Sequence, residues 1–400
     1  NVIRLILGNM SDGDNEKNNR YTRAASFLEQ WLSEGALTQD ESDSIYVYMQ
    51  DYRMVDGTLK TRTGFIALAK LEDFSSGKIL PHEKTLSGPK TDRLNLMKSC
   101  HCNFSQIFSL YSDKSLSIDQ LIAKSIEGKN PDMDVTDVAD IRHRIFRVSD
   151  AGTVSKVVSL MKDKRLFIAD GHHRYETALN FRNYNSENGE LPADSPYNYV
   201  MMYFANMDND GLVVFPTHRV LFNLDNDQIN FLKSEVDTYF SVVDFPFNKE
   251  NELSVRDEFA ERLTAEGETK HAFGMYVKGD KSYHLLIAED TQKIESVLRD
   301  DMDSSLRELD VTVLHSVIID HLLGVGTKAQ ENQENLKYVK NVDKAIELVK
   351  DGDFQVTFLL NPTKIDQVKS VASAGNKMPQ KSTFFYPKLL TGLVINKLNS

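Results

Sequence analysis

The sequence predicts an α+β protein, in which a mixed-sheet core carries a second α/β unit that is either inserted or appended. Four hundred residues exceed the length of a usual single domain, so two compact units are the first expectation. Residues 45–50 and 63–71 are rich in aromatic and β-branched residues, which indicates an antiparallel hairpin. Residues 166–182 pass from an apolar run through one glycine into a helical pattern, which indicates a buried strand followed by a helix.

The first 224 residues are expected to form the core. In chain order, apolar spacing predicts helices at residues 21–32, 117–125, 151–162 and 172–182. Runs of apolar and β-branched residues predict the strands, which are 2–7, 45–50, 63–71, 107–111, 143–148, 166–169, 197–204 and 212–215. Gly35 follows the first helix at the place where a C-terminal glycine is common.

The stretch from Asp225 to about Gly326 differs from both flanks, because it is rich in acidic helices and shows no catalytic constellation. The expected elements here are helices at 229–240, 255–264, 292–299 and 309–323, and a hairpin of 272–277 with 283–288. His315 and His321 are not spaced to bind one metal on a helix face. We expect residues 225–330 to form an acidic α/β unit.

The last part of the chain regains a regular alternation of elements. The expected elements are strands at 336–339 and 354–360 and helices at 342–349 and 364–373. The closing motif shares hydroxyl, lysine and aromatic chemistry with the first part of the chain. We therefore expect residues 331–400 to return to the core of residues 1–224.

The clearest chemistry lies in the stretch KRLFIADGHHRYETALNFR, residues 164–182. Gly171 allows a sharp turn, and the first amides of the following helix point outward, where they can bind an anion. His172, His173 and Arg174 place positive charge where the helix dipole disfavours it, unless an anion is bound. We interpret this turn as a phosphate or carboxylate site that includes Asp170. The alternative is that Asp170 only caps the helix while the histidines pack locally.

A second polar stretch, ILPHEKTLSGPKTDRLNLMKS, begins near residue 79. Pro81 and the pair at 88–89 predict irregular backbone on both sides of His82 and Glu83. Glu83 can act as a general base or a metal ligand. Lys90 and Arg93 supply positive charge that can pair with an anion. The alternative is a solvated surface pair.

Two more motifs bear cationic and hydroxyl groups. The tetrad PTHR places His218 and Arg219 after a strand, and a surface turn is an equal alternative to a functional role. The closing stretch MPQKSTFFYPKLLTGL also contains Lys388. Its phosphate-binding candidates are Lys381, Ser382 and Thr383. We also expect its aromatic residues to pack as a C-terminal strand.

The composition of the chain limits the classes of molecule that it is expected to bind. A net charge of −12 disfavours non-specific binding to nucleic acid or to an anionic membrane, and no apolar run approaches the ~18 residues of a membrane span. We expect Cys100 and Cys102 to be reduced, as in a cytoplasmic protein. The chain starts without Met and is expected to begin inside a longer natural chain. An anionic small molecule bound in a local basic pocket is the expected partner, and the oligomeric state stays open.

The motifs PHEKT, GPKTDRL, ADGHHRYETAL, FPTHRV and MPQKSTFFYPKLLTGL resemble the domain-of-unknown-function 1015 family in order and over nearly the whole chain. The DGHHR turn is also similar to the signature of the ParB and sulfiredoxin-like superfamily, especially its free-serine kinases. That resemblance implies a ParB/sulfiredoxin-like core, with nucleotide phosphates and Mg²⁺ held by the residues from Asp170 to Arg174. It also implies that Glu83 takes the proton of the serine hydroxyl, with Asp170 as metal ligand.

The leading hypothesis is therefore a phosphotransferase that moves phosphate between a nucleotide, ATP or ADP, and a small hydroxyl substrate such as serine. Such chemistry needs phosphate-positioning donors, usually Mg²⁺, and a carboxylate that orients or deprotonates the nucleophile. One alternative is a phosphatase acting on phosphoserine, with water as the nucleophile. Another is a nucleotide-binding regulator of the ParB type, although no basic recognition helix is evident.

Overall fold

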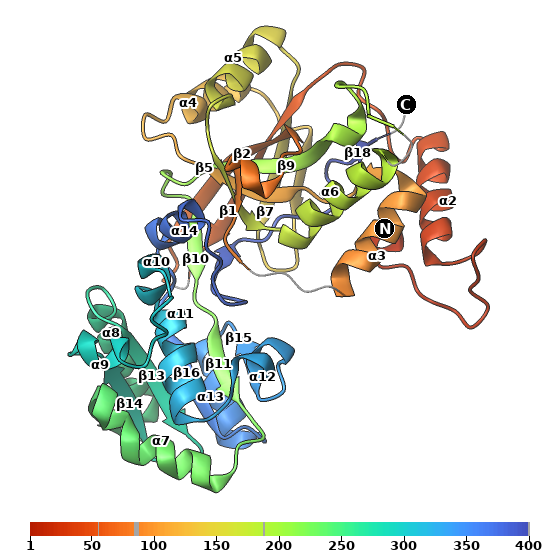
Figure 1. The fold of residues 1–400 in the computed structure, drawn as a ribbon. Coiled ribbons are helices and arrows are strands. Elements are labelled where there is room, and N and C mark those ends of the chain that lie inside the picture. The colour runs from red at the N-terminus through yellow and green to blue at the C-terminus, as the bar shows by residue number, and fades with distance from the viewer. Residues whose placement is uncertain (55, 84–87, 187–188, 399–400) are drawn as a thin grey trace. The chain divides into compact units, whose positions relative to one another are not determined.

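The computed structural model describes residues 1–54, 56–83, 88–186 and 189–398, and it divides into two compact units (Figure 1). Unit 1 comprises Asn1–Pro81, Thr85–Val213 and Pro387–Ser400. Unit 2 comprises His82–Lys84 and Val214–Tyr386. The segment 331–400 is thus divided between the units, since it belongs to unit 2 as far as Tyr386 and to unit 1 from Pro387 onward.

In the described residues, unit 1 is built on an eight-stranded mixed sheet with the order β3-β8-β5-β9-β2-β1-β7-β6. Its strands are β1 (Ile45–Arg53), β2 (Leu59–Lys70), β3 (Ile79–Pro81), β5 (Ile107–Tyr111), β6 (Met133–Thr136), β7 (Arg142–Val148), β8 (Leu166–Asp170) and β9 (Tyr199–Asn206). Strand β3 runs parallel to β8, and β5 runs parallel to β9, whereas the other neighbours are antiparallel. The expected hairpin of β1 and β2 is confirmed, and so is the α+β fold class.

The helices of unit 1 are α1 (Ile3–Ile6), α2 (Arg20–Ser33), α3 (Gly88–Cys100), α4 (Ser117–Ile126), α5 (Ala151–Met161) and α6 (His172–Ser186). Helix α3 packs against both α2 and α6, and α4 packs against α5. The main core combines buried residues of the sheet, such as Ile107 and Ile168, with Tyr175 and Ala178 of α6. The buried face of α6 is therefore fixed on the sheet, which holds its first turn at the end of β8.

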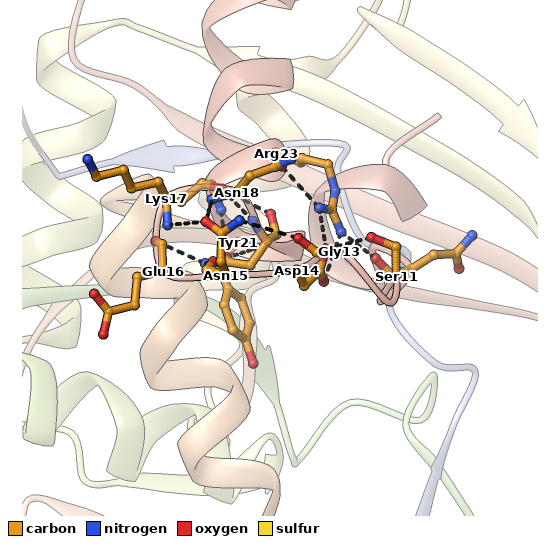
Figure 2. Close-up of polar contacts among 12 residues, drawn as sticks. Ser11, Gly13, Asp14, Asn15, Glu16, Lys17, Asn18, Tyr21 and Arg23 are labelled. Atoms are coloured by element: carbon orange, nitrogen blue, oxygen red, sulfur yellow. Dashed lines mark hydrogen bonds and ion pairs between the residues drawn. The ribbon is translucent and has the colours of Figure 1, made fainter.

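The polar loop before α2 is ordered by its own side chains (Figure 2). Arg23 forms two ion-pair contacts with Asp14, at 2.7 and 3.2 Å. The Asn15 side chain accepts the backbone amides of Lys17 and Asn18. Asn19 then caps α2 in a capping box, so the loop and the helix start form one local structure.

Unit 2 contains a six-stranded sheet with the order β12-β14-β13-β16-β11-β15, in which the paired strands are antiparallel. Its strands are β11 (His218–Leu221), β12 (Ser241–Pro246), β13 (Ala272–Val277), β14 (Ser282–Ile287), β15 (Leu336–Val339) and β16 (Val356–Leu360). Helices α8 (Glu252–Glu266) and α13 (Val342–Asp351) pack on this sheet. Phe259, Tyr283, Ile346 and Leu359 belong to the resulting core.

The remaining elements are shorter or lie outside the two main sheets. Strand β10 (Val213–Phe215) pairs with β17 (Phe384–Tyr386), and β4 (Cys102–Asn103) pairs with β18 (Asn396–Lys397). The other helical segments are η1 (Phe74–Ser76), η2 (Pro196–Asn198), α7 (Asn226–Tyr239), α9 (Thr291–Glu295), α10 (Ser304–Arg307), α11 (Asp310–Val313), the π-helix η3 (Leu314–Leu322), α12 (Thr327–Asn332) and α14 (Ile365–Ser373). Cys100 and Cys102 are buried free thiols. No helix among the described residues has the length and apolar character of a membrane span.

Three local expectations are wrong. The strand expected at 2–7 is the short helix α1, because Leu5 finds its apolar partners on α2, among them Ala24 and Leu28. The irregular backbone expected at 88–89 is the first turn of α3, where a proline fits because its missing N–H has no helical acceptor.

The third concerns the helices of the acidic block. The helix expected at 292–299 ends at Glu295, and the acidic residues that follow favour a turn and a new cap, with Asp303 accepting the amide of Ser305 at 2.9 Å. The helix expected at 309–323 is present from Asp310 to Leu322, as α11 continued by the π-helix Leu314–Leu322.

Candidate functional site

The turn between β8 and α6 has the form that the sequence predicted. Residues Leu166–Ala169 are buried in the sheet, Asp170 ends the strand, and α6 starts at His172. Gly171 has a φ of +95°. A Cβ atom at this position would lie 2.8 Å from Nε and from Nη2 of Arg174. The turn therefore needs glycine both for its backbone conformation and for the close approach of Arg174.

Two cations lie beside the Asp170 carboxylate. Lys388 Nζ donates to Asp170 Oδ2 at 3.1 Å, and Arg174 Nη2 lies 3.9 Å from the same oxygen. Arg174 Nη1 also donates to the carbonyl of Gln106. Burial alone would raise the pKa of Asp170, but the charges of Lys388 and Arg174 outweigh it and lower the pKa to about 2. Asp170, Gly171, Arg174 and Lys388 are called the Asp170 site below.

Lys388 reaches this position because residues 387–391, the C-terminal strap, are bonded to the sheet of unit 1. Arg62 Nη2 donates to the carbonyl of Pro387 at 2.6 Å, and Gln50 Nε2 donates to that of Lys388 at 2.9 Å. The Leu390 amide donates to the Tyr48 hydroxyl at 3.2 Å, and the Leu390 carbonyl accepts Gln106 Nε2 at 3.1 Å. These bonds fix the backbone from which Lys388 extends.

Arg62 is an unusual support for the strap. It is 1% exposed, bonds the Gln50 side chain, and packs 4.5 Å from the ring centroid of Phe108. Its Nε and Nη1 have no hydrogen-bond partner among the described residues. Burial lowers the pKa of Arg62. A buried cation with unpaired N–H groups lowers the free energy of unfolding. The role of Arg62 in positioning the strap offers a reason for its presence.

The other predicted residues of unit 1 lie on α3 and α6. His172 is buried and His173 half-buried in the first turn of α6. Lys90 of α3 forms an ion pair with Glu176 of α6. Arg93 donates to the carbonyl of Ile6 at 3.3 Å, and its charge contributes to a lowered pKa of Arg174, for which burial is the larger cause.

A second group, in which predicted residues come together with His315, lies in unit 2 and is called the Arg219 cluster below. It consists of His82, Glu83, His218, Arg219, His315, Lys381 and Thr383. His82 Nε2 lies 2.9 Å from Thr383 Oγ1, and Glu83 Oε1 accepts the amide of Lys381 at 3.0 Å. Arg219 Nη2 donates to the carbonyl of Lys381 at 3.4 Å, and its Nε donates to His315 Nε2 at 3.1 Å. Ser382 lies between Lys381 and Thr383 in the sequence, and its side chain is buried. The Ser382 hydroxyl donates to the carbonyl of Pro379 at 2.6 Å.

The PTHR residues of the Arg219 cluster are buried, so the surface turn considered for PTHR is wrong, although Lys381 is exposed and Glu83 half-buried. His218 and Arg219 are each 1% exposed, because β11 lies between β16 and β15. Burial lowers the pKa of Arg219 to about 10, which leaves the guanidinium charged at neutral pH. Burial and the charge of Arg219 lower the pKa of His218 to about 4 and that of His315 to about 3. Both imidazoles are therefore neutral at pH 7.

The structure thus brings the predicted residues into two groups, one in each unit. Lys388 was noted in the closing motif but not assigned to Asp170, and no pattern in the sequence indicated that Gln50 and Arg62 support the strap. His315 was placed in a block without catalytic residues, yet it bonds Arg219. The expected phosphate-binding roles of Lys381, Ser382 and Thr383 stay predictions, as do the binding roles of the other predicted residues.

The residues at Asp170 do not form a metal site by themselves. Among the described residues there is no group of three or more His, Cys, Asp or Glu side chains that could hold a metal ion. Asp170 brings one carboxylate, already paired with cations, so a magnesium ion there would take most of its ligands from substrate phosphates and water. Mg²⁺ at Asp170 stays a prediction.

Comparison with known proteins identifies a family and gives distant structural likenesses. A sequence profile described as "Protein of unknown function (DUF1015)" matches residues 1–312. No curated protein matches the chain. A conserved hypothetical protein from Pyrococcus furiosus is similar with 14% identity and a TM-score of 0.39, over 83% of this chain and 95% of that one.

Solved structures of a free serine kinase give similar values. The kinase in complex with AMP has 14% identity and a TM-score of 0.40, and a variant in complex with ADP has 13% and 0.41. Each comparison covers 83% of this chain and 92% of the other. At such TM-scores the likeness carries no conclusion about activity.

Proposed function

The chain belongs to the family of proteins of unknown function DUF1015, and we propose that it is a phosphotransferase that moves a phosphoryl group between a nucleotide and a small hydroxyl compound, with serine as the first acceptor to test. The observation that carries this proposal is the Asp170 site, where a carboxylate and two cations meet at the start of a helix. We also propose that unit 1 has a ParB/sulfiredoxin-like core, on the resemblance of its ADGHHRYETAL motif.

The Asp170 site contains the kinds of groups that phosphoryl transfer requires from a protein. The reaction depends on holding the phosphates in place and on balancing the negative charge that spreads over the transferring group. Arg174 presents a planar fork that suits two phosphate oxygens, and Lys388 adds a point charge. The first amides of α6 add donors that point out of the helix. Asp170 holds both cations together until an anionic substrate competes for them.

The acceptor hydroxyl needs a base, and we assign this role to Glu83 on the resemblance to free-serine kinases. A serine hydroxyl is a poor nucleophile at neutral pH, and a carboxylate within about 2.6–3.2 Å can take its proton. Glu83 Oε1 accepts the Lys381 amide at 3.0 Å, and this bond would fix the carboxylate in one orientation. With water in place of the hydroxyl compound, the same groups would hydrolyse phosphoserine.

The test is an assay of phosphoserine formation from serine with ATP or ADP and common divalent metals, beside phosphate release from phosphoserine. Arg174→Met and Lys388→Met should each lower kcat/KM by roughly 10²–10³-fold, because each removes charge stabilisation from the transition state. Glu83→Gln should lower kcat by roughly 10²–10⁴-fold and leave nucleotide affinity nearly unchanged.

The matched control is Arg165→Met, which removes an exposed arginine just before β8 and should leave turnover unchanged. If the parent protein shows neither activity, the reaction is wrong. If Arg174→Met behaves like the control while the parent is active, the reaction stands but its phosphates bind elsewhere. Normal turnover by Glu83→Gln would remove that residue from the mechanism alone.

A further inference from the structure

Three neighbouring strands of unit 1 place a row of polar side chains against the C-terminal strap. In the pairing of β2, β1 and β7, Gln50 lies opposite both Arg62 and His143. Tyr48 is two residues from Gln50 on β1, so its side chain is on the same face of the sheet. These four residues are buried. The row is therefore fixed by the register of the sheet.

The side-chain amide of Gln50 has one possible orientation. Arg62 can only donate, so the Gln50 atom that accepts from it is the oxygen Oε1. Gln50 Nε2 donates to the carbonyl of Lys388 at 2.9 Å. The same Nε2 lies 3.4 Å from His143 Nδ1. Because Nε2 carries hydrogen, its position beside Nδ1 indicates that Nδ1 holds a lone pair and no proton.

The other side of the His143 ring gives the same tautomer. His143 Nε2 lies 3.3 Å from Oδ2 of Asp137, which is in the turn between β6 and β7. Burial alone would raise the pKa of Asp137, but the amides of Ile141 and Ala139 outweigh it and lower the pKa. The carboxylate is ionised and can only accept, so the ring proton is on Nε2. Nδ1 therefore accepts the hydroxyl hydrogen of Tyr48, with an O–N distance of 2.6 Å.

These bonds form one chain from the strap to the surface, which is called the His143 latch below. The Leu390 amide donates to the Tyr48 oxygen at 3.2 Å. Tyr48 donates to His143, and His143 donates to Asp137. The Asp137 side chain is 20% exposed, so the chain ends at solvent. Every donor in the latch points away from the strap.

A proton added at Nδ1 is incompatible with this order of bonds. The ring would become a donor on both sides. The Tyr48 oxygen would then face two donors, His143 and the Leu390 amide, and its own hydrogen would need another acceptor. Gln50 Nε2 would also face a donor at 3.4 Å. The two groups that a charged His143 displaces, Tyr48 and Gln50, are the ones that bond the strap at Leu390 and Lys388.

The charges that face His143 have opposite effects. Among the described residues, Tyr48 of β1, Arg62 of β2 and Asp137 of the turn face it, while the ammonium group of Lys388 lies at the Asp170 site. Burial is the largest cause that lowers the pKa of His143, and the charge of Arg62 lowers it further. The bond and charge of Asp137 act in the other direction without reversing the shift. The closed strap therefore holds a neutral imidazole.

The arginines of β7 do not add to this balance, since each is held in an ion pair. The pairs are Arg142–Asp134, Arg144–Asp51 and Arg147–Asp40. The first two lie on the opposite face of the sheet, because residues 142 and 144 alternate with His143. Helix α4 also packs on that opposite face, in the main core. His143 is thus the group of the latch that can change its charge near neutral pH.

We propose that His143 and Tyr48 are positioning residues that keep the C-terminal strap closed, and that a proton on His143 opens the strap. The open strap moves Lys388 away from Asp170, so the Asp170 site is complete only while the latch is neutral. The consequence for turnover rests on the proposed function. The opening itself is a property of the protein without substrate.

The sign of the pH dependence follows from the burial of His143. In the open strap, water reaches the imidazole and its pKa returns towards the ordinary value of about 6.5. The open state therefore binds more protons than the closed state below about pH 6.5. Closure is fully favoured above this pH. It is lost as the pH falls from there towards the lowered pKa of His143 in the closed strap.

The test is hydrogen exchange of the amides at 388–391 in the whole chain, between about pH 5 and 8. Exchange rates divided by the intrinsic rate at each pH give the opening constant of the strap. It should rise below about pH 6.5 by up to about tenfold per pH unit, the limit for one proton. The amides of β13 and β14 in unit 2 are the internal reference and should keep their protection. An opening constant that is equal at both ends of the range would overturn the proposal.

His143→Asn removes the proton and keeps the acceptor, because the asparagine oxygen replaces Nδ1 opposite Tyr48. Its strap should show an opening constant that does not change with pH. The matched control is His101→Asn, in a half-buried residue of unit 1 whose Nδ1 lies 3.0 Å from the Tyr197 hydroxyl. His101 has a φ of +48°, a conformation that asparagine tolerates. The control should respond to pH like the parent. A full pH response in His143→Asn would show that another group is the sensor.

Tyr48→Phe separates positioning from simple support. The ring still packs on Tyr203, with centroids 5.5 Å apart in the parent, but the hydroxyl between His143 and Leu390 is gone. The Leu390 amide should exchange several-fold faster at pH 8, and most of its pH response should be lost. Faster exchange with the parent's full pH response would mean that Tyr48 only supports the strap.

Nuclear magnetic resonance of the parent protein tests the latch without a substitution. The ring nitrogens of His143 should show the Nε2–H tautomer at pH 8, and they should titrate with the same midpoint as the Leu390 amide. An Nδ1–H tautomer or two separate midpoints would contradict the latch. Nucleotide affinity should fall over the same pH range in the parent and stay level in His143→Asn. If the strap opens in acid but no phosphoryl transfer is found, the latch stands and the proposed function fails.

Discussion

Gly171 sets the geometry of the Asp170 site more directly than any charged residue in it. Its φ of +95° is strained for any residue with a Cβ atom, and that atom would meet the guanidinium of Arg174 at 2.8 Å. We predict that Gly171→Ala lowers the free energy of unfolding by roughly 1–3 kcal/mol. It should also displace Arg174 and weaken nucleotide binding, measured by calorimetry.

The control for this change is Gly77→Ala, also in unit 1. Gly77 has a φ of +69°, and a Cβ atom there would have no neighbour within 4 Å. The control should therefore lose stability through its backbone without any change in nucleotide affinity. A Gly171→Ala protein with the parent's affinity would show that Arg174 adjusts or is not needed.

At the scale of single residues, some features of the Asp170 site could be predicted from the sequence and others could not. The turn at Asp170, Gly171 and Arg174 is local, so its spacing could be recognised. Lys388 lies 218 residues away in the chain, and no local pattern connects it with Asp170. In the sequence, Arg62 cannot be told from an exposed arginine of a strand. The alternation of polar and apolar residues along a strand does not show which polar side chains become buried under a segment that lies much later in the chain.

At the scale of elements, the C-terminal strap connects the buried sheet with the Asp170 site. We predict that Arg62→Met leaves the free energy of unfolding within about 1 kcal/mol of the parent, because it relieves the burial of a charge while it removes bonds. The strap should then loosen, which misplaces Lys388 and lowers kcat/KM by roughly 10–100-fold. Hydrogen exchange of the amides at 388–391 reports the loosening.

Lys388→Met is the matched comparison for this element. It removes the cation but keeps the bonds of Arg62 and Gln50 to the strap backbone, so it should lower turnover without faster hydrogen exchange. If exchange in Arg62→Met equals that in the parent, Arg62 does not position the strap, and its burial needs another explanation.

The elements that the sequence predicted well are those whose apolar pattern is long or bounded by turns. The hairpin of β1 and β2 and the strand–glycine–helix unit of β8 and α6 are examples. The short run that forms α1 could not be told from a strand, because a few apolar residues fit either period. The π-helix was not predicted either, because its apolar residues keep nearly the spacing of an α-helix although its backbone hydrogen bonds join residues five apart.

At the scale of the whole molecule, two compact units with separate cores define the fold. We predict two calorimetric unfolding transitions. Removal of residues 387–400 takes from unit 1 the four hydrogen bonds of the strap backbone, together worth about 2–6 kcal/mol, and with them the side-chain bonds of Lys388 and Thr391. The transition of unit 1 should fall by roughly 5–20 °C, while that of unit 2 keeps its temperature.

The truncation itself identifies the transitions, because residues 387–400 belong to unit 1 and their loss should lower only the transition of that unit. Lys388→Met serves as the control, since it keeps the strap and should leave both transitions in place. A single transition that shifts as a whole after the truncation would contradict the independence of the units. The length of the chain indicated two units, but the path of the chain between them depends on long-range packing that composition cannot show.

The strap also has a consequence for the order in which the protein is made. β8 and α6 leave the ribosome early, and the whole of Val214–Tyr386 follows before Lys388 emerges. Domains generally fold during synthesis as their residues appear, so unit 2 can form its core while unit 1 still lacks its strap. Asp170 therefore has no contact with Lys388 while unit 2 is being translated. A nascent chain lacks a complete Asp170 site until Lys388 leaves the ribosome.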